Sequence, residues 1–122
     1  KAPIEFTTAP ADAINKVITK SNMKLEDIEL IELNEAFAAQ YIGCERELGL
    51  NRDITNINGS GIGLGHPVGA TGARIMVTLL HAMKKRGKTL GLATLCGGGG
   101  FRWPRPLKWF KIAYDRHIVF YI

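Results

Sequence analysis

Three short segments of this sequence carry residue types that can move a proton or bind a reacting oxygen. Asn34 follows an aliphatic stretch, His66 lies beside Pro67 in a glycine-rich segment, and Cys96 directly precedes a run of glycines. Imidazole and thiol groups act as bases and nucleophiles, and glycine lets backbone N–H groups approach an oxyanion. These three side chains are therefore the candidate catalytic residues.

Each candidate also has a simpler structural interpretation. Asn34 can be a plain helix N-cap, His66 a turn residue before Pro67, and Cys96 a buried thiol. Taken singly, both interpretations stay open for each residue. Their order and their glycine-rich context together favour chemistry.

Other kinds of site fit the sequence poorly. Counted from Gly61 or Gly63, the Rossmann fingerprint fails at its last glycine, and the glycine-rich segment has no lysine where a P-loop needs one. The histidines His66, His81 and His117 show none of the spacings of zinc sites. We therefore predict no metal and no bound cofactor, and we expect His81 to be a surface or partly packed helix residue.

Hydrophobic periodicity predicts alternating helices and strands around the candidates. The predicted order is a helix capped by Thr8 and ended by Asn22, a strand over 28–33, a helix over 34–48 ended by Gly49, a brief strand over 54–58, a helix that follows the glycine-rich segment 59–72 and ends at Gly87, and a strand over 89–95. This alternation implies an α/β fold with a mixed, mostly parallel sheet packed against helices. The candidates then stand at strand C-termini or helix N-termini, where ligands bind in open sheets.

Two of these helices carry apolar stripes that we expect to be buried. The stripe residues are Phe37, Tyr41, Cys44 and Leu48 on the second helix, and Met76, Leu79, Leu80 and Met83 on the third. Cys44 lies within its stripe, so we interpret it as a small core residue and not as a reagent.

Composition divides the chain near Gly100. The whole chain is 46% hydrophobic and 22% charged, as in globular domains, and no apolar run reaches the roughly 20 residues that span a bilayer. Residues 1–100 hold 11 Lys/Arg against 10 Asp/Glu, whereas residues 101–122 hold five against one, with seven of the ten aromatic residues. Two cysteines without paired spacing suit a reducing compartment. We expect a cytoplasmic protein, with mitochondrial or peroxisomal location as the alternatives.

Three segments give the sequence a specific resemblance to the C-terminal domain of thiolases, and most of all to the acetyl-CoA acetyltransferases among them. The segments are NEAFAA over 34–39, GHPVGATGAR over 65–74 and LCGGG over 95–99. The condensing enzymes of fatty-acid synthesis share only the Gly-His segment and come second. The resemblance covers residues 1–100, which it marks as part of a thiolase-like layered half.

The resemblance implies roles for individual residues. Thiolases join or split 3-ketoacyl-CoA through an acyl group carried on a cysteine. By similarity, His66 activates that cysteine, and Cys96 is the acid/base for the methyl proton of acetyl-CoA. Asn34 orients a water in an oxyanion site, the Gly98 N–H serves a second oxyanion hole, and Phe37 lines the pantetheine channel. A helix N-terminus and a nearby histidine can lower the pKa of a thiol, which would let Cys96 act as a base.

The resemblance also implies partners. They are acyl-CoA and CoA, as substrates or products and not as cofactors. The intact enzyme is expected to be a homo-oligomer that binds neither nucleic acid nor membrane.

Two features depart from that family. The acyl-carrying cysteine belongs to a half that this sequence lacks, and Cys44 cannot replace it, so we expect the chain alone to be inactive. Residues 101–122 form a basic aromatic tail, interpreted as out-of-frame or unrelated sequence. Pro104 and Pro106 lie where the family's last strand should run, so we expect an uncovered, association-prone sheet edge. The alternative is a non-catalytic thiolase-fold fragment whose tail binds a membrane or nucleic acid.

Overall fold

The computed structural model describes residues 9–96, 110–114 and 117–121. The elements, in chain order, are α1 (Ala9–Ser21), the 3₁₀ turn η2 (Leu25–Asp27), β1 (Leu30–Leu33), α2 (Ala38–Leu48), α3 (Gly61–Leu64), α4 (Thr71–Arg86), β2 (Leu90–Thr94), β3 (Phe110–Tyr114) and β4 (His117–Tyr121). Gly49 and Gly87 end α2 and α4 in the left-handed conformation, each with φ of 64°. Both glycine stops are as the sequence predicted.

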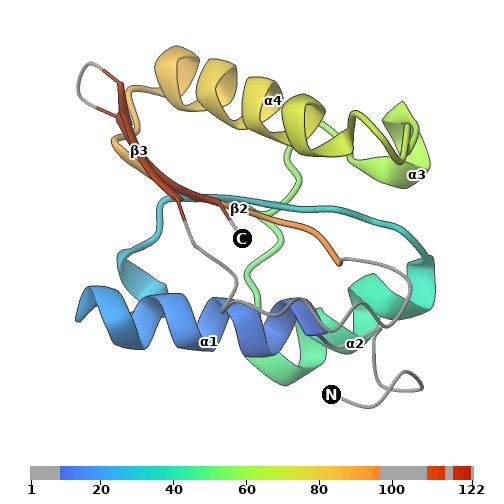
Figure 1. Ribbon diagram of the computed structural model, residues 1–122, viewed down its shortest axis with the longest axis horizontal. Helices are drawn as coiled ribbons and strands as arrows, with labels where there is room; N and C mark the ends of the chain where they lie inside the picture. The colour runs from blue at the N-terminus through green and yellow to red at the C-terminus, as the bar shows by residue number, and fades with distance from the viewer. Residues whose placement is uncertain (1–8, 97–109, 115–116, 122) are drawn as a thin grey trace.

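The strands form one sheet with the order β1-β2-β4-β3. β1 pairs with β2 in parallel, with Leu33 opposite Thr94, and β2 pairs in parallel with β4. β3 and β4 form an antiparallel pair at the far edge. Figure 1 shows α1 and α2 below the sheet and α4 with α3 above it. The predicted α/β fold with a mostly parallel sheet is confirmed.

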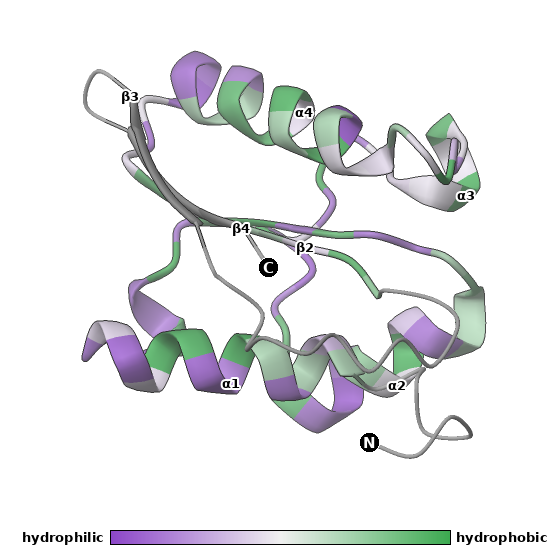
Figure 2. Cartoon of the chain, in the orientation of Figure 1, coloured by the Kyte–Doolittle hydropathy of each residue, from purple (hydrophilic) through white to green (hydrophobic). Residues whose placement is uncertain are grey.

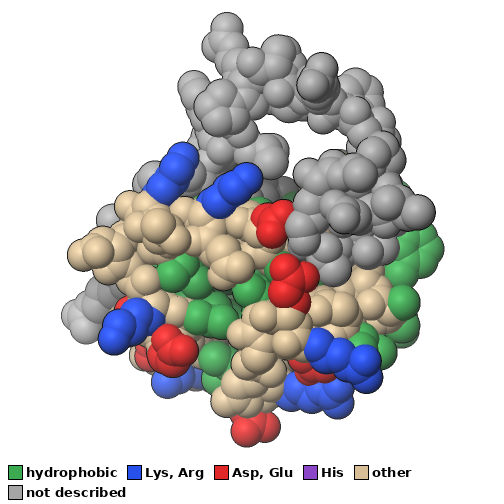
Figure 3. All heavy atoms as spheres, turned by 90° about the horizontal axis from the view of Figure 1, so that it is seen from below, with side chains coloured by type: hydrophobic (Ala, Val, Ile, Leu, Met, Phe, Trp, Pro, Cys, Tyr) green, Lys and Arg blue, Asp and Glu red, His purple; other side chains and the backbone are tan. Residues whose placement is uncertain are grey.

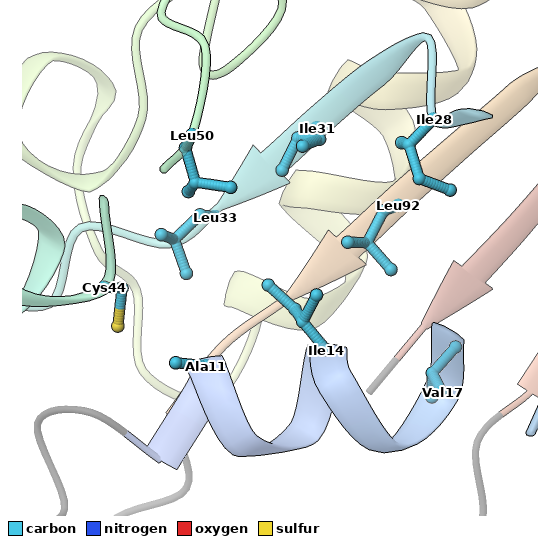
Figure 4. Packing of buried hydrophobic residues seen from close by; sticks show 9 residues of the cluster. All are labelled: Ala11, Ile14, Val17, Ile28, Ile31, Leu33, Cys44, Leu50 and Leu92. Atoms are coloured by element: carbon cyan, nitrogen blue, oxygen red, sulfur yellow. The ribbon is translucent and has the colours of Figure 1, made fainter. Parts of the chain in front are cut away.

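A separate apolar cluster fills each interface between the sheet and its helices. The cluster below the sheet joins Ile14 of α1, Leu33 of β1, Cys44 of α2 and Leu92 of β2, as Figure 4 shows. The cluster above it contains Ile75, Leu79 and other residues of α4. Figure 2 shows hydrophobic and hydrophilic residues alternating around α1 and α4, as amphipathic helices require.

The predicted core residues fall mainly where expected. Cys44 is fully buried in the lower cluster, which confirms its interpretation as a core residue. Leu79 and Met83 are buried, and the stripe residues that pack partly buried are Tyr41, Leu48, Met76 and Leu80. Phe37 is 61% exposed, because it precedes the first turn of α2 with an extended backbone and so lies off the apolar stripe.

Two local predictions were wrong, and one short helix was not predicted. The helix predicted over 34–48 begins only at Ala38. The strand predicted over 54–58 is reduced to a single bridge between Thr55 and Ile31, and the short helix α3 was not expected. Around residues 34–37 and 54–58, tertiary hydrogen bonds to the end of β1, described below, replace the helix start and the strand that periodicity predicts.

The uncovered sheet edge was also a wrong expectation. The edge of β2 is covered by β4, whose residues Ile118 to Tyr121 lie opposite Leu90 to Ala93. Pro104 and Pro106 lie outside the described residues. The covering strand comes from the later, proline-free part of the tail, so the prolines do not interrupt its ladder.

The face that carries α1 and α2 shows both signs of charge. Figure 3 shows lysine and arginine interspersed with aspartate and glutamate among apolar patches, and not a uniformly basic field. No helix within the described residues has the length and apolar character needed to cross a membrane.

Candidate active site

Asn34 lies immediately after β1, in a backbone fixed by its neighbours. Its N–H donates to the Thr94 carbonyl at 3.0 Å, which extends the β1–β2 register by one residue, and its side chain is fully buried. A Cβ at Gly61 would collide with the Glu35 carbonyl and come within 3.2 Å of Asn34 Oδ1. Glycine at position 61 therefore lets the start of α3 pack directly against this turn.

A second segment holds the end of β1 through side chains. Asn56 accepts a hydrogen bond from the Leu33 N–H at 2.9 Å and donates one to the Leu33 carbonyl at 2.8 Å. Ser60 Oγ donates to the same carbonyl at 3.2 Å. These contacts take the place of a strand ladder here. They explain why residues 54–58 make only one bridge and why Asn34 does not start a helix.

His66 is held in one tautomer by Thr71, in the first turn of α4. Its Nδ1 lies 2.6 Å from Thr71 Oγ1, and that hydroxyl donates to the Pro67 carbonyl at 3.0 Å. A hydroxyl has a single proton to donate, so Thr71 must accept from His66, and Nδ1 carries the ring proton. Nε2 is therefore left with a lone pair and is the nitrogen able to accept a proton.

The structure brings Asn34 and His66 together. The Asn34 Nδ2 lies 3.4 Å from His66 Nδ1 and 3.5 Å from Nε2. The amide is nearly equidistant from the two ring nitrogens, so it lies against the imidazole ring and not in line with the lone pair of either nitrogen. At these distances the contact is loose, so the amide N–H and the Nε2 lone pair can both serve a reacting group placed between them.

Cys96 reaches the same edge of the sheet through strand register. It stands two residues beyond β2, whose last residue, Thr94, lies opposite Leu33 and next to Asn34. The side chain is half-buried, and burial raises the pKa of the Cys96 thiol above its usual value. The sequence suggested that the pKa of this thiol could be lowered, which would favour the thiolate. The environment in the structure raises the pKa instead, because desolvation outweighs the other influences.

The other two predicted site residues stand apart from this cluster. Phe37 lies three residues beyond Asn34 with its ring exposed, at the N-cap position of α2. Gly98 lies outside the described residues. Their roles remain predictions from the resemblance. His81, an exposed residue of α4, takes no part in the site.

Sequence reasoning missed the charged groups behind Asn34. Arg74 of α4 donates from Nη2 to Asn34 Oδ1 at 3.1 Å and to Ser60 Oγ at 3.3 Å. Glu32 of β1 is 1% exposed, and burial raises its pKa to about 7, against a lowering by Arg74 and a smaller rise from Glu35. A charged residue inside the apolar run 28–33 was the available signal for this pair.

The family follows from the comparisons with known proteins. The family described as "Thiolase, C-terminal domain" matches residues 1–103. The chain is 57% identical over 98 residues to an acetyl-CoA acetyltransferase of Escherichia coli, which covers 80% of this chain and 25% of that protein. It is 49% identical over 98 residues to the cytosolic acetyl-CoA acetyltransferase of Mus musculus, with 80% and 25% covered.

A solved structure gives the same result for the fold. The crystal structure of the Bacillus anthracis acetyl-CoA acetyltransferase superposes with a TM-score of 0.80 at 54% identity, covering 82% of this chain and 25% of that one. The chain belongs to the thiolase C-terminal domain family. It spans about a quarter of the length of the acetyl-CoA acetyltransferases that it matches.

Proposed function

We propose that this domain supplies acid–base and oxyanion groups to an acyl-CoA C-acetyltransferase. The enzyme would condense two acetyl-CoA molecules, or cleave 3-ketoacyl-CoA with CoA, through an acyl group on a cysteine of the remaining chain. The observation that carries the proposal is the contact of the Asn34 amide with the His66 ring at the carboxyl end of β1. Homology to acetyl-CoA acetyltransferases supports CoA thioesters as the substrates.

His66 and Asn34 act in the acylation step. His66 Nε2 takes the proton of the nucleophilic thiol. In condensation the thiolate attacks the thioester carbonyl of acetyl-CoA, and CoA leaves as its thiolate. In cleavage it attacks the 3-keto carbonyl of 3-ketoacyl-CoA, and the C2–C3 bond breaks to release acetyl-CoA as a carbanion that takes its proton from Cys96. Nδ1–H stays with Thr71, so the ring keeps its orientation as Nε2 gains and loses the proton. The Asn34 amide N–H, directly or through a water, and the protonated Nε2 then stabilise the thioester oxygen of the second substrate.

Cys96 acts in the condensation step. Its thiolate removes a methyl proton from acetyl-CoA, and the resulting carbanion attacks the acyl-cysteine to form 3-ketoacyl-CoA and regenerate the nucleophile. The burial that raises its pKa makes the thiolate scarcer but a stronger base, which suits a weakly acidic C–H. The Gly98 N–H and the Phe37 ring keep their proposed roles in the second oxyanion hole and the pantetheine channel.

The test separates these two steps in the complete enzyme, meaning this domain joined to the remainder of a thiolase chain. We expect Cys96→Ser to keep a full acylation burst and to lose exchange of acetyl-CoA methyl protons into deuterated water by about 10²–10⁴-fold. The matched control is Cys44→Ser, which replaces the other cysteine of the chain. This variant should keep the exchange of acetyl-CoA methyl protons. Normal exchange in the Cys96→Ser enzyme would remove Cys96 from the mechanism.

The 122-residue chain alone should have no turnover. Without the acyl-carrying cysteine the covalent route is missing, and oxyanion groups cannot replace it. The measurement is acetoacetyl-CoA cleavage with free CoA, by the chain alone and after addition of the remaining polypeptide. Turnover by the chain alone that depends on Cys44 would contradict the proposal.

A second candidate is an interaction module with a basic aromatic tail. The observation in its favour is the concentration of five Lys/Arg and seven aromatic residues in 101–122. Binding to anionic vesicles or nucleic acid that weakens with salt, and that is lost when those residues are removed, would support it. For the enzyme we propose a cytoplasmic homo-oligomer without affinity for either.

A further inference from the structure

The side-chain amide of Asn34 has two orientations of nearly equal shape. One presents the Nδ2 donor to His66 and the other presents the Oδ1 acceptor. Only the first can donate to a developing oxyanion. The second would turn Oδ1 toward a ring whose Nδ1 already donates to Thr71, and would leave this fully buried acceptor without a donor there. Whatever selects the orientation therefore decides whether this site stabilises or repels negative charge.

Arg74 makes that selection by contact. Its Nη2 donates to Asn34 Oδ1 at 3.1 Å and to Ser60 Oγ at 3.3 Å. Guanidinium has donors only, so the amide atom that faces it must be the oxygen. The Ser60 hydroxyl donates its single proton to the Leu33 carbonyl, and its oxygen can therefore accept a hydrogen bond from Arg74. The chain of donors and acceptors is consistent in one arrangement, which leaves Nδ2 facing His66.

The same turn of α4 holds both members of the pair. Thr71 fixes the tautomer of His66, and Arg74, three residues later, fixes the amide of Asn34. Residues three apart share one face of a helix, so both contacts come from the face of α4 that packs on β1. A shift of this helix end would move both contacts together.

Glu32 is a second buried ionisable group near Arg74. It lies two residues before Asn34 on β1 and so shares the face of the sheet that looks toward α4. Among the described residues, its Oε2 and the Nε and Nη1 of Arg74 are buried without hydrogen-bond partners, and the two charges attract. The guanidinium donates to Asn34 and Ser60 through Nη2, while its other two nitrogens are buried without partners. Such an arrangement lowers the stability of the fold, so stability does not explain why an arginine stands here.

We propose that Arg74 is a positioning residue, which holds the Asn34 amide with Nδ2 toward His66. The catalytic consequence rests on the function proposed above, whereas the orientation of the amide does not. Arg74 touches no reacting atom in this arrangement and acts only through Asn34.

The first experiment follows the amide itself in the 122-residue chain by NMR. The Asn34 NH₂ signals, assigned by their loss in Asn34→Asp, should be ordered and protected from exchange in the native chain. We expect Arg74→Met to lower their order parameters and raise their exchange at least tenfold, and Arg74→Lys to restore part of the order. Arg86→Met, at the exposed end of α4, is the control and should leave them unchanged.

The second experiment is a double-mutant cycle in the complete enzyme. Arg74→Met should lower kcat by about tenfold to a hundredfold, with KM nearly unchanged, and Arg74→Lys should recover part of the loss. In the Asn34→Ala background, Arg74→Met should cost nothing further, because the group it positions is already gone. A merely structural role would give additive losses.

The outcomes separate this proposal from the function beneath it. An Asn34 amide that stays ordered in Arg74→Met, or losses in kcat that add in the double variant, would overturn the role of Arg74. If Asn34→Ala itself kept full kcat, the proposed catalytic role of Asn34 would be wrong. The NMR experiment would still test whether Arg74 orients the Asn34 amide. Arg74→Lys keeps the charge, so it answers the question even where Arg74→Met folds poorly.

Discussion

The two faces of β1 differ in what they bury. Ile31 and Leu33 point down into the apolar cluster with α1 and α2, where hydrophobic side chains pack together. Glu32 and Asn34 point up toward α4, where a buried carboxylate, an amide and a guanidinium meet, some with unsatisfied atoms. Protein interiors tolerate such groups only at a cost in stability. One strand thus carries an apolar face that packs in the core and a polar face that belongs to the candidate site.

Removal of the imidazole should give the largest effect. In the complete enzyme, we expect His66→Ala to slow both acylation and condensation by about 10²–10⁴-fold, because Nε2 is the base that we propose for the nucleophilic thiol. The measurement is the acylation burst together with steady-state thiolysis. The control is Thr71→Val, which removes only the anchor of Nδ1 and should cost less. An unaffected acylation burst in His66→Ala would contradict the proposed role of His66, and with it the assignment of chemistry to the upper face of β1.

A change on the lower face should alter stability and not chemistry. We expect Ile14→Ala to lower the free energy of unfolding by about 2–5 kcal/mol, because it leaves a cavity in the lower cluster. Urea denaturation measures the loss, and kcat per folded complete enzyme should stay within about twofold of the parent. A large fall in kcat at full folding would show that the two faces are coupled through the sheet.

Glu32 should make stability depend on pH near neutrality. Its folded pKa is about 7 against an ordinary value of 4.5, so the folded state binds the proton more tightly. The sign follows: stability is lost as pH rises from 4.5 through 7, by up to about 3 kcal/mol. We expect Glu32→Gln to flatten this decline and to be relatively more stable at pH 8 than at pH 5. Parallel urea-denaturation curves for both chains across that range would contradict the shift.

Glu29, just before β1, should behave in the opposite way and with a smaller effect. The backbone N–H groups of Thr89 and Leu90 hold the pKa of its carboxyl at about 2, with further help from the Thr89 hydroxyl and Lys88. Its contribution is present above pH 4.5 and is lost as pH falls toward 2. Because this carboxylate is partly exposed, we expect Glu29→Gln to cost only about 1 kcal/mol at pH 7. Equal losses at pH 7 and pH 2.5 would show that the charge is not what matters.

Much of the fold was predictable because local signals agreed with it. The glycine stops at Gly49 and Gly87, the alternation of helix and strand, and the core position of Cys44 all follow from periodicity and backbone preference. The prolines of the tail misled, because they forbid a strand only where they stand, and β4 forms further along. The stretch 34–37 misled because Asn56 and Ser60 bind the end of β1 from a distant segment.

The sequence by itself determined which residues we propose to carry the chemistry. Asn34, His66 and Cys96 are recognisable from residue type, glycine context and order, since those properties are local to each segment. Only the tertiary structure decided how they are tuned. The Nδ1–H tautomer of His66, the orientation of the Asn34 amide and the raised pKa of Cys96 depend on Thr71, Arg74 and burial. Hydrogen-bond direction and desolvation are set by neighbours that the fold brings from far along the chain, so no local pattern encodes them.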